Sequence, residues 1–150
     1  MAEDPGALVA VICEDDVALA TALVDTVTNV YGLRLAATVA SAAEAIAATA
    51  HFKADLVVID LALAGHLGLG VVAALHEASP GCAVVVVVSP TFVTLEVEAV
   101  AAGAMTLVES SDLRPLQCCI EHLTQVHGDD CPSCADQQRR RTSLWRWHDL

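Results

Sequence analysis

The chain has 150 residues, the size of one ordinary domain, and 55% of them are apolar while 17% are charged, which excludes a disordered protein. Its formal net charge of −12 with neutral histidines argues against a body that binds nucleic acid or anionic lipid by neutralising phosphates. The N-terminal residues show no pattern of a signal peptide, and the longest apolar runs are too short to span a bilayer, so we expect a cytoplasmic protein.

The first third of the chain reads as strand, helix, strand and helix. The first helix has apolar residues at helical spacing, and Gly32 supplies its C-terminal stop. The second helix opens with Ser41 and Glu44 at the spacing of a capping box, in which side chains satisfy free backbone N–H groups. The four elements lie at 7–13, 16–32, 33–40 and 41–52, and the apolar positions of the first helix are Ala20, Leu23, Val24, Val27, Val30 and Tyr31.

The same alternation continues to about residue 127. Pro80 and Gly81 stop the third helix, and Gly103 lies past the end of the fourth. Pro115 is tolerable in the fifth helix because it falls in the first turn, where a backbone N–H has no helical partner. The strands of this part lie at 54–60, 82–89 and 104–110, and the helices at 68–79, 91–103 and 111–128.

Five strand–helix units in a row indicate one α/β domain. The strands are apolar throughout rather than alternating, which is typical of a parallel sheet with both faces covered. We therefore predict a flavodoxin-like (βα)5 three-layer sandwich with the strand order 2-1-3-4-5 and right-handed crossovers. The domain would occupy 1–127, and the polar segment 128–150, which carries most of the chain's arginines, would be a flexible tail.

Carboxylates stand where two neighbouring strands of this sheet would end, and ligands of such sheets bind at the carboxyl ends near the reversal of strand order. The predicted order places Glu14, Asp15 and Asp60 together. Three carboxylates repel one another unless a hard cation joins them, and Mg²⁺ accepts carboxylates together with a phosphate oxygen. Ser89, after the fourth strand, would add a hydroxyl group. Taken singly, Asp15 or Asp16 could also be a helix N-cap.

From about residue 8 to 126 the chain resembles the receiver domain of two-component response regulators. The resemblance implies that Asp60 accepts a phosphoryl group from a histidine kinase or phosphotransfer protein, and that the protein is a signalling module and not an enzyme. Its motifs are ICEDD with the acidic pair Glu14 and Asp15, LVVIDLALAGHLGLG with Asp60 and Gly68, VVVVVSP with Ser89, and GAMTLVESSDL with the Gly103–Ala104 pair.

The resemblance also implies what surrounds the acceptor. Mg²⁺ would be held by Glu14, Asp15 and Asp60, and Ser89 would hydrogen-bond the phosphoryl group. Phosphorylation would change the surface formed by the fourth helix, fifth strand and fifth helix, a face that also serves a homodimer. Too few residues follow the fifth helix for a DNA-binding module. We therefore expect a stand-alone regulator that acts through a protein output partner, with no direct DNA binding by the receiver body and no membrane contact.

The sequence departs from the family pattern on the side that reads the phosphoryl group. The lysine expected after the fifth strand is Ser110, and the only lysine of the chain is Lys53, which we expect at the opposite end of the sheet. Ala64 replaces a loop proline, Leu107 an aromatic residue, and Pro90 a residue with a backbone N–H. Two interpretations stay open. Either the acceptor is still phosphorylated with weaker activation, or the domain is a pseudo-receiver that works through binding alone.

The tail contains a CxxC motif, Cys131 and Cys134. Such a pair is half of a zinc site, which His127 could help to complete, or it is a redox dithiol or incidental. A third hypothesis is therefore a metal- or redox-responsive regulator centred on the tail. We expect the six cysteines to be mostly reduced in the cytosol, with Cys13 and Cys82 as small buried hydrophobic residues.

A basic and aromatic stretch follows the CxxC motif. It is either a solvated end or a docking motif, since arginine and tryptophan are enriched at the centres of protein interfaces. It could also fold back on the acidic crevice of the same chain. Its residues are Arg139, Arg140, Arg141, Trp145 and Trp147.

Overall fold

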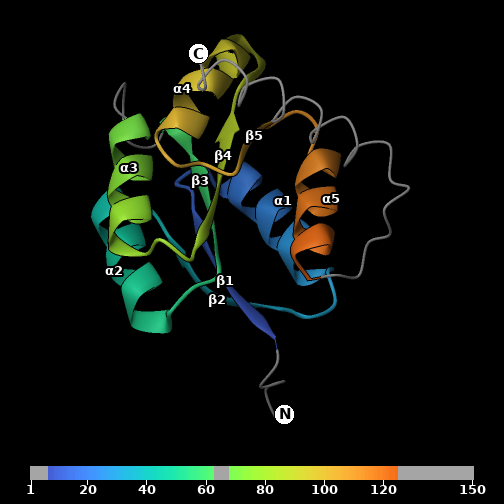
Figure 1. Ribbon diagram of the computed structural model, residues 1–150. Coiled ribbons are helices and arrows are strands. Elements are labelled where there is room, and N and C mark those ends of the chain that lie inside the picture. The colour runs from blue at the N-terminus through green and yellow to red at the C-terminus, as the bar shows by residue number, and fades with distance from the viewer. Residues whose placement is uncertain (1–6, 63–67, 125–150) are drawn as a thin grey trace.

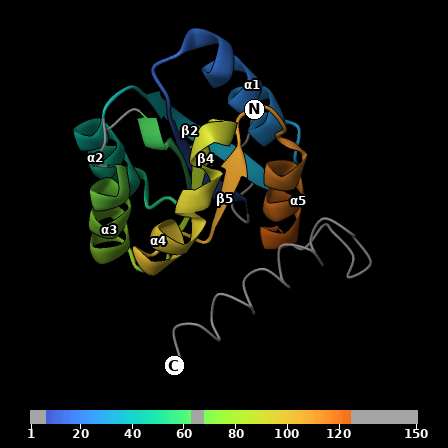
Figure 2. The same cartoon turned by 90° about the horizontal axis from the view of Figure 1, so that it is seen from above.

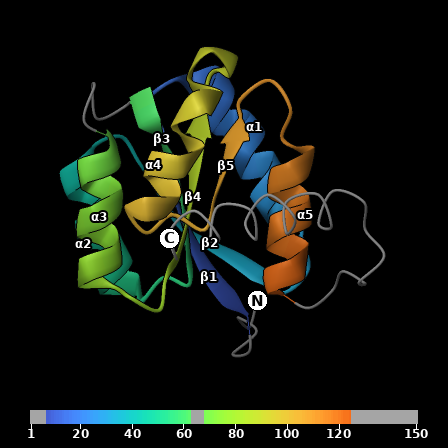
Figure 3. The same cartoon turned by 45° about the horizontal axis from the view of Figure 1, so that its top comes forward.

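A computed structural model describes residues 7–62 and 68–124 of the chain. Five parallel strands form one sheet in the order β2-β1-β3-β4-β5, and helices cover both of its faces (Figures 1, 2 and 3). This confirms the predicted flavodoxin-like fold and its strand order. The elements are β1 Leu8–Cys13, α1 Val17–Thr28, β2 Leu33–Val39, α2 Ala42–Phe52, β3 Leu56–Asp60, α3 Gly68–Ala78, β4 Ala83–Val88, the 3₁₀ helix η2 Pro90–Leu95, α4 Glu96–Ala101, β5 Thr106–Glu109 and α5 Arg114–Leu123.

The continuous apolar strands are explained by two hydrophobic cores, one on each face of the sheet. Successive residues of β3 point to opposite sides, so Val57 packs toward α2, α3 and α4 while Val58 packs toward α1 and α5. Cys13 and Cys82 are buried in the first of these cores, as expected. Because every position of a central strand faces one core or the other, the first polar positions come where the strand ends.

Local signals at two helix starts are confirmed with one difference. The hydroxyl of Ser41 accepts a hydrogen bond from the backbone N–H of Glu44 at 3.2 Å. The Glu44 carboxylate, however, accepts from that hydroxyl at 3.1 Å rather than from the backbone N–H of Ser41. Pro115 lies in the first turn of α5, as predicted. Among the described residues, no helix is both long and apolar enough to cross a membrane.

The prediction for Tyr31 is wrong. Its place on the apolar face of the first helix required a helix that continued to residue 31, but α1 ends at Thr28, with Asn29 as its C-cap. Tyr31 lies in the following turn and is 81% exposed. The turn is needed because the carbonyl of Gly32, at φ +87°, accepts the N–H of Leu8 and starts β2 beside β1.

The fourth predicted helix also differs in its first half. Pro90–Leu95 forms a 3₁₀ helix, and α4 begins only at Glu96. The 3₁₀ stretch contains Thr91, Val93 and Thr94, and β-branched side chains lose rotamer freedom in an α-helix. No side chain caps the start of α4. Weak local α-helical preference therefore makes the chain after β4 a tight 3₁₀ segment.

Gly103 offers a test of the packing that closes the first core. At its φ of +116°, an added Cβ would lie 2.6 Å from Cγ of His76 on α3, so Gly103→Ala should lower the free energy of unfolding by about 1–3 kcal/mol. Gly70→Ala is the matched control, because a Cβ there meets nothing within 4 Å. Urea denaturation measures both variants. Equal effects of the two substitutions would contradict the packing role of Gly103.

Candidate functional site

Two carboxylates meet at the ends of the adjacent strands β1 and β3. The register pairs Cys13 with Ile59, so that the next residue of each strand, Glu14 and Asp60, reaches the same edge of the sheet. Glu14 is only 4% exposed, and the carboxyl group of Asp60 lies close enough for its charge to act on Glu14. The structure therefore brings these two predicted site residues together.

The carboxylate of Glu14 is only half satisfied. Its Oε1 accepts the backbone N–H of Asp16 at 3.0 Å, whereas its Oε2 is buried with no hydrogen-bond partner among the described residues. Oδ1 of Asp60 accepts the backbone N–H of Ala62 at 2.9 Å. A buried carboxylate oxygen without a donor is costly, and a cation is the kind of group that would satisfy it.

The electrostatics of the pair point to the same need. Burial raises the pKa of Glu14 from 4.5 to about 8, and the neighbouring carboxyl group of Asp60 and the charge of Asp15 add to the rise. The thiol of Cys13 beneath them has its pKa raised to about 12 by burial and by the neighbouring carboxylates. Without a cation, ionisation of Glu14 is therefore disfavoured.

Asp15 and Asp16 lie on the exposed side of this pair. Asp16 is the N-cap of α1, and its Oδ1 accepts the N–H of Ala18 at 3.0 Å, which confirms the capping role weighed for it. Asp15 is exposed, and its charge acts on Glu14. Within 7–62 and 68–124, no three His, Cys, Asp or Glu side chains are grouped to hold a metal ion. Asp15 as a third ligand thus stays a prediction.

The hydroxyl groups expected opposite the acceptor follow β4 and β5. Asp60 is in register with Val87, and Ser89 lies exposed just beyond the end of β4. The N–H of Ser110 donates to the carbonyl of Val88 at 2.7 Å, which extends the β4–β5 pairing by one residue. Ser110 therefore stands next to Ser89 with its backbone N–H already used.

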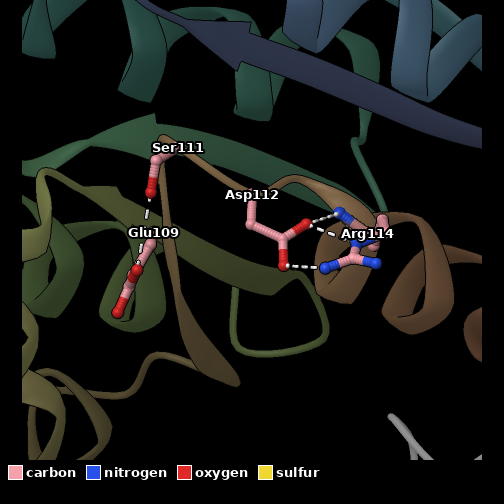
Figure 4. Close-up of polar contacts among 4 residues, drawn as sticks. All are labelled: Glu109, Ser111, Asp112 and Arg114. Atoms are coloured by element: carbon pink, nitrogen blue, oxygen red, sulfur yellow. Dashed lines mark hydrogen bonds and ion pairs between the residues drawn. The ribbon is translucent and has the colours of Figure 1, made fainter.

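The cations of the described residues are placed away from the acceptor or are already paired. Lys53 is the C-cap of α2 at φ 51°, at the edge of the sheet opposite to Asp60, as predicted. Arg114 forms a two-pronged contact with Asp112, with Nε to Oδ1 at 2.8 Å and Nη2 to Oδ2 at 2.9 Å (Figure 4). This contact lowers the pKa of Asp112 and raises that of Arg114.

One carboxylate at this edge was assigned only a structural role by the sequence. Glu44 accepts a hydrogen bond from the hydroxyl of the N-cap Ser41, but its charge also acts on Cys13 together with those of Glu14, Asp15 and Asp60. The signal was available, because a helix that follows a parallel strand starts at the carboxyl edge of the sheet. The remaining predicted positions, Ala64, His127, Cys131 and Cys134, lie outside the described residues.

Comparisons with known proteins identify the family and support the fold. The family model of the response regulator receiver domain matches residues 10–111. The chain is similar to the signal receiver domain of a DNA-binding response regulator (merR) from Colwellia psychrerythraea, with 21% identity over 79% of this chain and 98% of that one and a TM-score of 0.68. It is also similar to the signal receiver domain of the putative response regulator NarL from Mycobacterium tuberculosis, with 16% identity over 81% of this chain and 97% of that one and a TM-score of 0.66.

A third solved structure extends the likeness over more of the chain. It is a two-component response regulator of the LuxR family from Aurantimonas sp., with 19% identity over 91% of this chain and 99% of that one and a TM-score of 0.71. No curated protein sequence matches the chain. At these identities, the solved structures support the fold, while the family match rests on the sequence itself.

The buried charge of Glu14 predicts a pH-dependent loss of stability in metal-free buffer. The folded chain holds the Glu14 proton more tightly than the unfolded chain does, so the free energy of unfolding should fall as the pH rises from 4.5 to about 8. Glu14→Gln removes this slope and should be more stable than wild type at pH 9 by on the order of 2 kcal/mol. Urea denaturation with a chelator present, over pH 4–9, measures the effect.

The control for this experiment is Asp16→Asn, which removes a neighbouring charge and keeps an N-cap side chain. It should leave the pH slope nearly unchanged. If the free energy of unfolding of wild type and of Glu14→Gln depends on pH in the same way, the pKa of Glu14 is not raised by folding.

Proposed function

Because the chain belongs to the response regulator receiver domain family, we propose that Asp60 is its phospho-acceptor and that it takes a phosphoryl group from a histidine kinase or a phosphotransfer protein. Receiver domains are signalling modules that interact with histidine kinases. The observation that carries the proposal for this chain is the contact between Glu14 and Asp60 at the ends of β1 and β3. Packing alone does not explain it, because two carboxylates that share a site repel each other.

The carboxylates fit the Mg²⁺ that receiver domains typically bind. The unpartnered Oε2 of Glu14 is the observation that supports this fit, and Glu14, Asp15 and Asp60 are the residues that would hold the ion. When bound, Mg²⁺ offsets carboxylate charge and orients a phosphoryl oxygen. The exposed position of Asp15 leaves it free to turn toward such an ion, which makes it the ligand that completes the set.

The chemical step is a transfer to a carboxylate oxygen of Asp60. The oxygen attacks phosphorus, an O–P bond forms as the N–P bond of a phosphohistidine breaks, and the imidazole keeps the electron pair and takes up a proton. The N–H of Ala62 holds the other oxygen of Asp60, which orients the carboxylate for attack. Ser89 would donate its hydroxyl hydrogen to an oxygen of the transferred group.

The side that reads the phosphoryl group is atypical in this proposal. Ser110 offers a neutral hydroxyl where the family has a lysine, and Pro90 has no backbone N–H to donate. We expect a phosphoryl group that is held more weakly than by a lysine-bearing receiver, because charge-assisted hydrogen bonds are roughly twice as strong as neutral ones. The output then passes through protein contacts on the α4–β5–α5 face.

Ser110 also favours a second candidate function, a pseudo-receiver that binds its partner without phosphorylation. The two differ in one consequence, since only the first needs Asp60 to be chemically reactive. A metal- or redox-responsive function of the CxxC motif is a third candidate, and its residues lie outside the described part of the chain.

Phosphorylation of Asp60 is tested directly with a small phosphodonor such as acetyl phosphate in Mg²⁺. Intact-mass analysis should show one added phosphoryl group in wild type and none in Asp60→Asn. Asp55→Asn is the matched control at the other end of β3, where the side chain accepts the N–H of Val9 at 2.8 Å and an amide oxygen can do the same. Absence of the modification in wild type, with both Mg²⁺ and donor in excess, would favour the pseudo-receiver.

Ser110→Lys should restore the missing cation. We expect affinity for the phosphoryl mimic beryllofluoride in Mg²⁺ to rise about tenfold, because a hydrogen bond to a charged group contributes about 1.5–3 kcal/mol. Ser111→Lys adds the same charge one residue further along, at an exposed position, and should change affinity much less. Calorimetric titration compares the two. An equal gain in both would mean that only overall charge matters and that Ser110 is not the phosphoryl-reading position.

A further inference from the structure

The edge of the sheet at which the strands end carries a concentrated negative charge. We call it the carboxyl edge. Arg114 is the one lysine or arginine at this edge in the described part of the chain, and its guanidinium is bonded to Asp112. Lys53 and Arg34 lie at the opposite edge, before β3 and at the start of β2. The carboxylates of the carboxyl edge end a strand, follow one or begin the next helix, and they are Glu14, Asp15, Asp16, Glu44, Asp60, Glu96, Glu98, Glu109 and Asp112.

This edge contains one buried carboxyl group, that of Glu14, which a positive partner would stabilise. Glu14 is 96% buried, and its Oε2 has no hydrogen-bond partner among the described residues. Asp60 lies against it, and the charge of Asp15 acts on it as well. In the family, a lysine adds positive charge here, but the chain has Ser110 in that place. The carboxyl edge is therefore complementary to a cationic segment.

The sequence supplies one such segment. Residues 139–147 read RRRTSLWRW, with four arginines and no acidic residue. We infer that this segment binds the carboxyl edge of its own chain and supplies the positive charge that the described residues of that edge lack. Arginine suits the role because its planar guanidinium pairs with carboxylates in a two-pronged geometry.

The length of the intervening chain allows this contact. Thr124, just after α5, lies at the edge opposite to the carboxyl edge, since a Cβ on Gly32 would be 3.7 Å from its side chain. Arg139 comes fifteen positions after Thr124, and an extended chain of that length spans about 50 Å. A strand of six residues is about 20 Å long. The segment can therefore pass along the full height of the sheet and still lie across its carboxyl edge.

The two tryptophans of the chain make the inference measurable, because Trp145 and Trp147 both lie in this segment. Acrylamide, a neutral quencher, should quench their fluorescence roughly twofold less efficiently at about 20 mM salt than at about 500 mM, since salt screens the attraction. The full-length variant Arg139→Gln/Arg140→Gln/Arg141→Gln should show the high-salt value at both concentrations.

A matched pair of variants locates the contact. Asp16→Asn/Glu44→Gln/Glu109→Gln removes three charges from the carboxyl edge while keeping side chains that can cap α1 and α2, and it should weaken the protection of the tryptophans. The control Asp25→Asn/Glu77→Gln/Glu121→Gln removes three charges near the helix ends at the opposite edge and should leave the protection as in wild type.

Three outcomes would overturn the inference. These are quenching that does not depend on salt, equal effects of the two triple acidic variants, and protection that grows with protein concentration, which would place the segment on a second copy. Phosphorylation of Asp60 plays no part in this measurement. The proposed function can therefore fail while the docking stands, and the docking can fail while Asp60 is still phosphorylated.

Discussion

The feature on which the rest depends is the forced proximity of two carboxylates, Glu14 and Asp60. Strand pairing fixes it, because the register of β1 and β3 carries both chains to the same edge and leaves no freedom to separate their ends. In the absence of a cation, burial and the neighbouring carboxyl groups disfavour the ionised form of Glu14. The fold tolerates it because the two cores bury the four strand positions before each of these carboxyl groups, 10–13 in β1 and 56–59 in β3. Either a proton on Glu14 or a bound positive group relieves this cost.

Much of this could be predicted from the sequence, because the relevant signals were local or periodic. Apolar runs bounded by helical patterns fixed the five units, and Ser41 and Pro115 marked two helix starts correctly. The prediction that Tyr31 lies on the apolar face of the first helix was wrong because periodicity does not say where a helix ends. The end of α1 is decided by the turn that brings Gly32 to Leu8. The prediction of a regular α-helix directly after β4 was wrong for a related reason. Only the number of β-branched residues distinguished the 3₁₀ stretch from the start of an α-helix.

The sequence predicted which carboxyl groups of the candidate site lie together, but it did not predict how deeply they are buried. Glu14 and Asp60 could be paired from the strand order alone, since neighbouring parallel strands end side by side. The depth of burial of Glu14 could not, because it depends on how tightly the loop before α1 closes around it through the N–H of Asp16. For Glu44, the expected role in a capping box concealed its second effect, which is to add charge to the same edge. When a residue has a local role and a long-range role, the sequence pattern reveals the local role first.

The acceptor side of the site carries carboxyl groups, whereas the residues opposite it carry no charge. Glu14 and Asp60 supply negative charge in a buried setting, whereas Ser89 and Ser110 supply neutral hydroxyl groups, and the backbone N–H of Ser110 is already bonded to Val88. Neutral donors can orient a phosphoryl group, but they offset little of its charge. Positive charge for such a group must then come from outside the described fold. A divalent ion, a partner protein and the arginine segment of the chain itself would all serve the same electrostatic requirement, and they would compete for the same carboxylates.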